Sequence, residues 1–182
     1  MLLTLWTAQF VGGMAALSSL YLIRGEWSDL KVLDVPVIMP TSIAGYDPQY
    51  TYQVLLNEIV CTFIFVFMVL HVKGKNTSPS PIGVNGALVV ALTLYAVIYA
   101  GTAFGACYNP AIGASFAFLD FLMKKNGVYV YAYWYMYILG PFIGGALAGF
   151  VHWVHESCHA KEKEDNDQND KERERMLTNP TL

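Results

Sequence analysis

The clearest chemical signal in this 182-residue chain comes from Asn109, Pro110 and Ala111, which open an apolar segment ending near Met123. Asn followed by Pro is typical of a helix start, because the Asn side chain caps free backbone N–H groups and Pro suits the first turn. The free N–H groups and positive dipole end of such a helix can orient a water or hydroxyl and disfavour cations. Asn109 is therefore interpreted either as a donor that orients a passing water or hydroxyl, or as a structural cap that contributes about 1 kcal/mol to stability.

A second group of residues with ligand chemistry lies around position 155. On a continuing helix His152, His155 and His159 would share one face, and with the Cys158 thiol they could bind zinc or another soft metal. The competing interpretation is an interfacial belt, in which these residues and Trp153 lie at the membrane–water boundary at the end of a span. The usual spacing of zinc ligands is not met, so the belt is favoured, and neither a metal nor a cofactor is predicted.

Membrane helices are the elements that must position these residues. Hydrophobic residues make up 55% of the chain and charged residues only 14%, whereas about a quarter of the residues in soluble domains are charged. Four apolar segments, at 2–23, 53–72, 82–101 and 128–154, are each long enough for a helix that crosses a bilayer. A signal peptide is the alternative for the first, but no basic residue precedes it. The segment 109–123 is too short to cross and return, so it predicts a re-entrant half-helix.

Charge divides the chain into two parts. Residues 1–155 are expected to form an all-α transmembrane domain, and residues 156–182 a charged polar tail that is helical only around Lys171–Met176. The net charge of −3 lies in the tail and gives no basic surface for nucleic acid, so no nucleic-acid partner is predicted. The sequence has no convincing catalytic pair and no glycine-rich phosphate loop, so the chain is not expected to be an enzyme.

The segments and their residues resemble the aquaporin and glycerol-facilitator (major intrinsic protein) family. GTAFGACYNPAIGASFAF at 101–118 is similar to the family's second Asn-Pro-Ala loop. The family's third to sixth helices are similar to WTAQFVGGMAALSSLYLI (6–23), NEIVCTFIFVFMVLHV (57–72), GVNGALVVALTLYAVIYAG (83–101) and WYMYILGPFIGGALAGFVHW (134–153). The resemblance covers about residues 4–155. It implies an aquaporin-like partial bundle of four transmembrane helices plus one re-entrant half-helix.

The resemblance also gives Glu58 an expected role, since the family's glutamate at this place accepts hydrogen bonds from the loop backbone. An acid within a membrane span is costly and is usually paired or functional, so Glu58 is expected to brace residues 102–109. The alternative is displacement toward a lipid boundary. Small residues let helices approach closely, and this packing role is expected for Gly12, Gly13, Gly140, Gly144, Gly145 and Gly149.

The sequence departs from the family at positions that set selectivity. The family normally has an arginine directly after Asn-Pro-Ala, where this chain has Ile112. The filter histidine of water-selective members aligns with Val97, and Ala106 takes a third filter-equivalent position. The family's first two helices and first Asn-Pro-Ala loop have no counterpart in this sequence. One copy is therefore not expected to enclose a pore between two opposed caps, which favours the cap role for Asn109.

These departures favour a truncated, non-conducting structural or accessory subunit of a larger membrane complex. Its predicted partners are the lipid bilayer and other membrane-protein subunits, or further copies of the chain in a homo-oligomer. The hypothesis for its location is an energy-converting membrane, with a respiratory or ATP-synthase complex of the mitochondrial inner membrane as the example. The alternative is a channel for water or a small neutral, glycerol-like solute, completed by oligomerisation or by a partner chain. A third interpretation is a fragment whose first half lies upstream.

Overall fold

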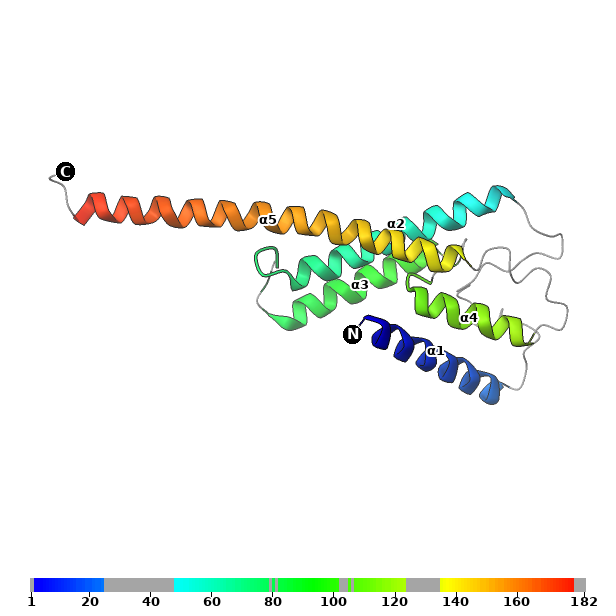
Figure 1. Ribbon diagram of the computed structural model, residues 1–182. Helices are drawn as coiled ribbons and strands as arrows, with labels where there is room; N and C mark the ends of the chain where they lie inside the picture. The colour runs from blue at the N-terminus through cyan, green and yellow to red at the C-terminus, as the bar shows by residue number, and fades with distance from the viewer. Residues whose placement is uncertain are drawn as a thin grey trace.

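The computed structural model describes residues 2–24, 48–78, 80, 82–101, 105, 107–123 and 135–178, and these residues form five helices (Figure 1). The helices are α1 (Leu2–Arg24), α2 (Pro48–Lys73), α3 (Gly83–Gly101), α4 (Pro110–Met123) and α5 (Met136–Thr178). None of the described residues is in a strand. The fold is therefore all-α, as the long apolar segments predict.

Two helices, α3 and α5, pack against α2. This helix runs beside α5 and also contacts α3, while α4 lies between α1 and α5 (Figure 1). The loop from α3 to α4 passes close to α2, so α2 can hold this loop as well as the two helices. The start of α4, where Asn109 lies, is consequently set by contacts with α1, α2 and α5 together.

The lengths and compositions of the helices are those of a membrane protein. Three described helices are long and apolar enough to cross a bilayer: Tyr52–Lys73 in α2, Gly83–Gly101 in α3, and α5 from Met136 onward. Large apolar side chains of α3, such as Val84, Leu88 and Leu92, are more than half exposed, which suits contact with lipid rather than water. The chain is an integral, multi-pass membrane protein.

The first and last predicted spans are only partly addressed by the structure. The helix α1 covers the predicted segment 2–23, but it is not among the three helices above, so its crossing of the membrane stays a prediction. Residues 128–134 of the last span lie outside the described residues, and helix α5 begins at Met136. The segment 109–123 forms α4, which is about 21 Å long at 1.5 Å per residue and too short to cross a hydrocarbon core of about 30 Å.

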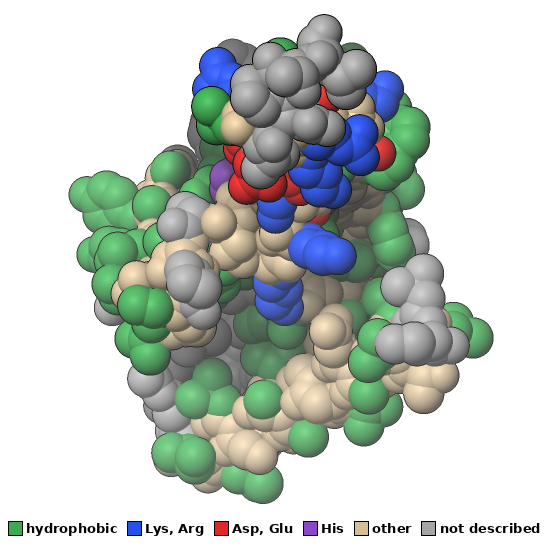
Figure 2. Space-filling model, turned by 90° about the vertical axis from the view of Figure 1, so that its left-hand side faces the viewer, with side chains coloured by type: hydrophobic (Ala, Val, Ile, Leu, Met, Phe, Trp, Pro, Cys, Tyr) green, Lys and Arg blue, Asp and Glu red, His purple; other side chains and the backbone are tan. Residues whose placement is uncertain are grey.

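The tail is far more helical than the sequence-based expectation. The helix α5 runs without a break from Met136 to Thr178, so it includes the predicted turn at Lys171–Met176 and all of the tail before it. Residues 156–178 contain no Gly or Pro and many Glu, Lys and Arg residues, which are good helix formers. Charged side chains gather around this projecting part of α5, above the hydrophobic side chains of the other helices (Figure 2).

Candidate functional site

The side chain of Glu58 holds the loop that precedes α4. Glu58 is fully buried in α2. Its Oε1 accepts a hydrogen bond from the backbone N–H of Cys107 at 3.0 Å, and its Oε2 accepts one from the backbone N–H of Tyr108 at 2.9 Å. Both carboxylate oxygens are thus directed at the loop rather than at the lipid. Irregular backbone between membrane helices needs such partners, because its N–H and C=O groups are not paired within a helix.

Three further residues fix the same loop. Asn57, next to Glu58, donates from Nδ2 to the carbonyl of Gly105 at 2.9 Å. Gly105 has a φ of 93°, and a Cβ there would lie 2.6 Å from the Tyr137 hydroxyl of α5. Tyr108 has a φ of 48°, and its buried hydroxyl donates to the Val97 carbonyl at 2.8 Å. The loop therefore takes a conformation that few residues adopt.

Asn109 caps the start of α4. Its Oδ1 accepts a hydrogen bond from the backbone N–H of Ala111 at 2.9 Å, and its carbonyl accepts the first helical hydrogen bond, from Gly113 at 3.0 Å. The other end of the amide, Nδ2, donates to Oε1 of Gln9 in α1 at 3.2 Å. Both ends of the Asn109 side chain thus have partners within the chain. The chemistry predicted for an Asn-Pro helix start is present, with Pro110 as the first residue of the helix.

Small residues allow α4 to lie close to its neighbours. Ser115 of α4 donates to the carbonyl of Phe10 in α1 at 3.0 Å, and a Cβ on Gly13 would lie 2.7 Å from its Oγ. On the other side, a Cβ on Gly113 would lie 2.6 Å from the Tyr137 carbonyl of α5. The half-helix is therefore held between α1 and α5 without room for a larger side chain at Gly13 or Gly113.

The filter-equivalent positions differ in their burial. Val97 is buried in a cluster with Cys61 and Tyr108. Ile112 is partly exposed on the first turn of α4. Ala106 lies outside the described residues. Val97 and Ile112 are both aliphatic. The structure adds that Val97 packs against Tyr108, a contact that sequence reasoning missed.

The predicted packing glycines fall into two sets. Gly13, Gly140 and Gly144 lie against neighbours: a Cβ on Gly140 would be 2.5 Å from Cβ of Glu58, and one on Gly144 would be 2.4 Å from the Ile59 carbonyl oxygen. By contrast, a Cβ on Gly12, Gly145 or Gly149 would have no described heavy atom within 4 Å. These three glycines have no such neighbour among the described atoms, so their packing role stays a prediction.

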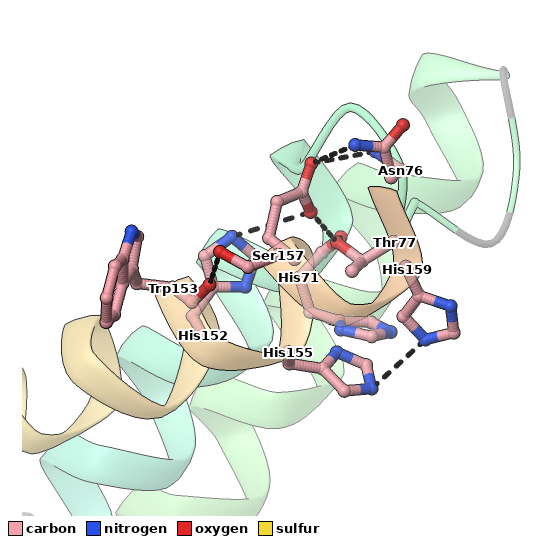
Figure 3. A network of polar contacts seen from close by, with 9 residues as sticks. His71, Asn76, Thr77, His152, Trp153, His155, Ser157 and His159 are labelled. Carbon is pink, nitrogen blue, oxygen red and sulfur yellow. Dashed lines mark hydrogen bonds and ion pairs between the residues drawn. The ribbon is translucent and has the colours of Figure 1, made fainter. Parts of the chain in front are cut away.

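Four histidines gather where α5 leaves the bundle (Figure 3). Nε2 of His155 lies 3.2 Å from Nε2 of His159, and the ring of His71, from α2, is 5.3 Å from that of His155. His152 lies 4.0 Å from Oε2 of Glu156. Cys158 is exposed and is not on the shared face. Within the described residues, no three His, Cys, Asp or Glu side chains are placed to hold one metal ion. The contribution of His71 could not be predicted from the spacing along α5.

Glu156 joins this end of α5 to the turn after α2. Its Oε1 accepts hydrogen bonds from the backbone N–H of Asn76 at 2.9 Å and from the Asn76 side chain at 3.2 Å. Its Oε2 accepts a hydrogen bond from the Thr77 hydroxyl at 3.0 Å. The carboxylate thus fixes the point at which α5 leaves the bundle.

Comparison with known proteins agrees with this architecture. The Major intrinsic protein family model matches residues 2–152. Probable aquaporin TIP1-1 of Oryza sativa subsp. japonica is 28% identical over 87% of this chain and 55% of its own length. Aquaporin TIP1-1 of Zea mays is 27% identical over the same shares. Probable aquaporin TIP3-2 of Arabidopsis thaliana is 29% identical over 81% of this chain and 48% of its own length.

The chain spans about half the length of the curated relatives it matches. No solved structure matches it. Aquaporins are channels rather than enzymes, in agreement with the expectation that this chain is not an enzyme. The helices place Asn109 at the start of a half-helix, and the family model covers the loop, α4 and the helices that hold them. The chain is a member of the major intrinsic protein family, which contains the aquaporins.

Proposed function

We propose that the chain forms one half of a pore for water or a small neutral solute, with the start of α4 as its polar constriction. The observation that carries this proposal is the position of Asn109 at the first turn of a half-helix. That turn follows a loop held by the buried carboxylate of Glu58. A rigid helix start of this kind presents its positive end and backbone N–H groups to a solute without further reorganisation.

The second half of the pore would come from another polypeptide or from a second copy of the chain. The described helices supply one helix start of this kind, and a pore needs further walls around it. Ile112, partly exposed on the first turn of α4, is aliphatic, so the constriction would be wider and less polar than one lined by arginine. We therefore expect a preference for small neutral solutes over ions.

Liposome permeability tests this proposal. Liposomes that contain the protein should shrink faster in hypertonic buffer, or take up glycerol faster, than empty liposomes, as measured by stopped-flow light scattering. Asn109→Asp keeps the oxygen that accepts from Ala111 but places a negative charge at the start of α4, so permeability should fall to the rate of empty liposomes. Asn166→Asp makes the same chemical change on the exposed tail and should leave permeability unchanged.

A second candidate function is a non-conducting accessory subunit of a larger membrane complex. The observation that favours it is the Asn109 side chain, whose two ends are engaged by Ala111 and by Gln9 as in a structural cap. A mitochondrial inner-membrane location stays a prediction. Extraction in mild detergent, followed by native mass measurement, distinguishes the two functions. A particle of unrelated subunits, together with no permeability above that of empty liposomes for folded protein, would support the accessory role and contradict the pore.

A further inference from the structure

We propose that His155 and His159 form a binding site for a divalent transition-metal ion such as Zn²⁺, at the point where α5 leaves the bundle. The sequence His155-Glu156-Ser157-Cys158-His159 places two histidines one helical turn apart, with a glutamate after the first. This H-E-x-x-H spacing puts two imidazoles on one face of a helix, where they can ligate the same ion.

The distance between the two rings fits this chemistry. Nε2 of His155 and Nε2 of His159 are 3.2 Å apart, and the two rings are nearly perpendicular (Figure 3). A zinc–nitrogen bond is about 2.0–2.1 Å long, so two nitrogen ligands of a tetrahedral ion lie about 3.3 Å apart. One ion can therefore bind both nitrogens with little movement of either side chain.

Neighbouring groups hold each ring in place. The ring of His155 packs against Phe67 and His71 of α2, with ring centres 6.5 and 5.3 Å away. Nδ1 of His159 lies 3.6 Å from Oε2 of Glu162, one turn further along α5. A small rotation of the exposed Glu162 side chain would bring the carboxylate within hydrogen-bond distance of Nδ1, which favours the tautomer with Nε2 free to bind a metal. The ring of His155 is thus oriented before an ion arrives, and that of His159 lies beside it.

Binding, rather than hydrolysis, is the chemistry that this site supports. In metalloproteases with the H-E-x-x-H sequence, the glutamate acts as a general base. Here Glu156 is turned toward Asn76 and Thr77 and accepts three hydrogen bonds from them. The protein supplies two ligands, because no third such side chain among those described converges on the pair, and water completes the coordination. Cys158 is next to His159 in sequence and so points about 100° away around the helix.

Calorimetric titration of the full chain in detergent micelles with Zn²⁺ tests the site. We expect one ion per chain, and dissociation constants raised roughly tenfold or more by either His155→Gln or His159→Gln, since even the loss of an outer-shell partner typically costs that much. His152→Gln removes a histidine of the same helix that is outside the pair, and Cys158→Ser removes the neighbouring thiol. Both variants should bind like the unchanged protein.

The outcomes show whether Zn²⁺ binds to His155 and His159 or to neighbouring side chains. Circular dichroism first confirms that each variant keeps its helix content. No Zn²⁺ binding by the unchanged protein would overturn the proposal. So would pair variants that bind Zn²⁺ as tightly as the unchanged protein, or loss of binding in Cys158→Ser. Cu²⁺ serves as a second probe: an electron paramagnetic resonance spectrum coupled to two imidazole nitrogens supports the site, and a spectrum without nitrogen coupling contradicts it. None of these results depends on whether the chain conducts a solute.

Discussion

Glu58→Ala should lower the free energy of unfolding by about 2–6 kcal/mol, because it leaves two buried N–H groups unpaired and each costs about 1–3 kcal/mol. The two groups belong to Cys107 and Tyr108, and Glu58 itself is fully buried. Unfolding by increasing SDS in mixed micelles, followed by circular dichroism, measures the loss.

Two further variants show whether the loss arises from these hydrogen bonds. Glu58→Gln keeps one oxygen that can accept from the loop but turns an NH₂ group toward the other N–H, so its stability should lie between those of Glu58→Ala and the unchanged protein. Glu164→Gln makes the same change on the exposed tail and should be neutral. If Glu58→Ala unfolded at the same SDS fraction as Glu164→Gln, the loop would not depend on Glu58.

Glu58 also shows what the sequence could predict about the site. An acidic residue inside an apolar segment needs a partner, and the resemblance to a known family places that partner in the loop before Asn109. The start of α4 was predictable for a local reason, since an Asn cap followed by Pro110 is a feature of neighbouring residues. The long apolar segments likewise predict where α2, α3 and α4 lie in the chain.

Features that depend on contacts between distant residues were not predictable. The positive φ of Tyr108 and the contact of its hydroxyl with Val97 depend on how the loop passes α2 and α3. Likewise, His71 is more than eighty residues before His155, and no periodicity connects them. The helical tail was underestimated for a different reason. Many of its residues favour helix, and the tail does not have to start a helix of its own. It extends α5, which is already formed when it reaches residue 156.

The glycines of α5 show the same limit, because spacing alone does not identify the face that meets a neighbour. Gly140 and Gly144 are four residues apart, and so are Gly145 and Gly149, so each pair has the spacing of small residues at a helix contact. The structure turns the first pair toward α2 and leaves the second without neighbours within 4 Å among the described atoms. Stability measurements on matched variants can therefore determine which face of α5 is the contact face.

Gly144→Ala is expected to destabilise the protein by about 1–3 kcal/mol, the usual cost of forcing extra volume into a packed contact. Its Cβ would lie 2.4 Å from the Ile59 carbonyl oxygen and 3.1 Å from the Phe63 backbone nitrogen. Because backbone atoms cannot rotate away, α2 and α5 would have to separate. Gly145→Ala should be neutral or stabilise by up to about 1 kcal/mol, since Ala favours helix over Gly. Equal SDS unfolding midpoints for both variants would contradict a contact at Gly144.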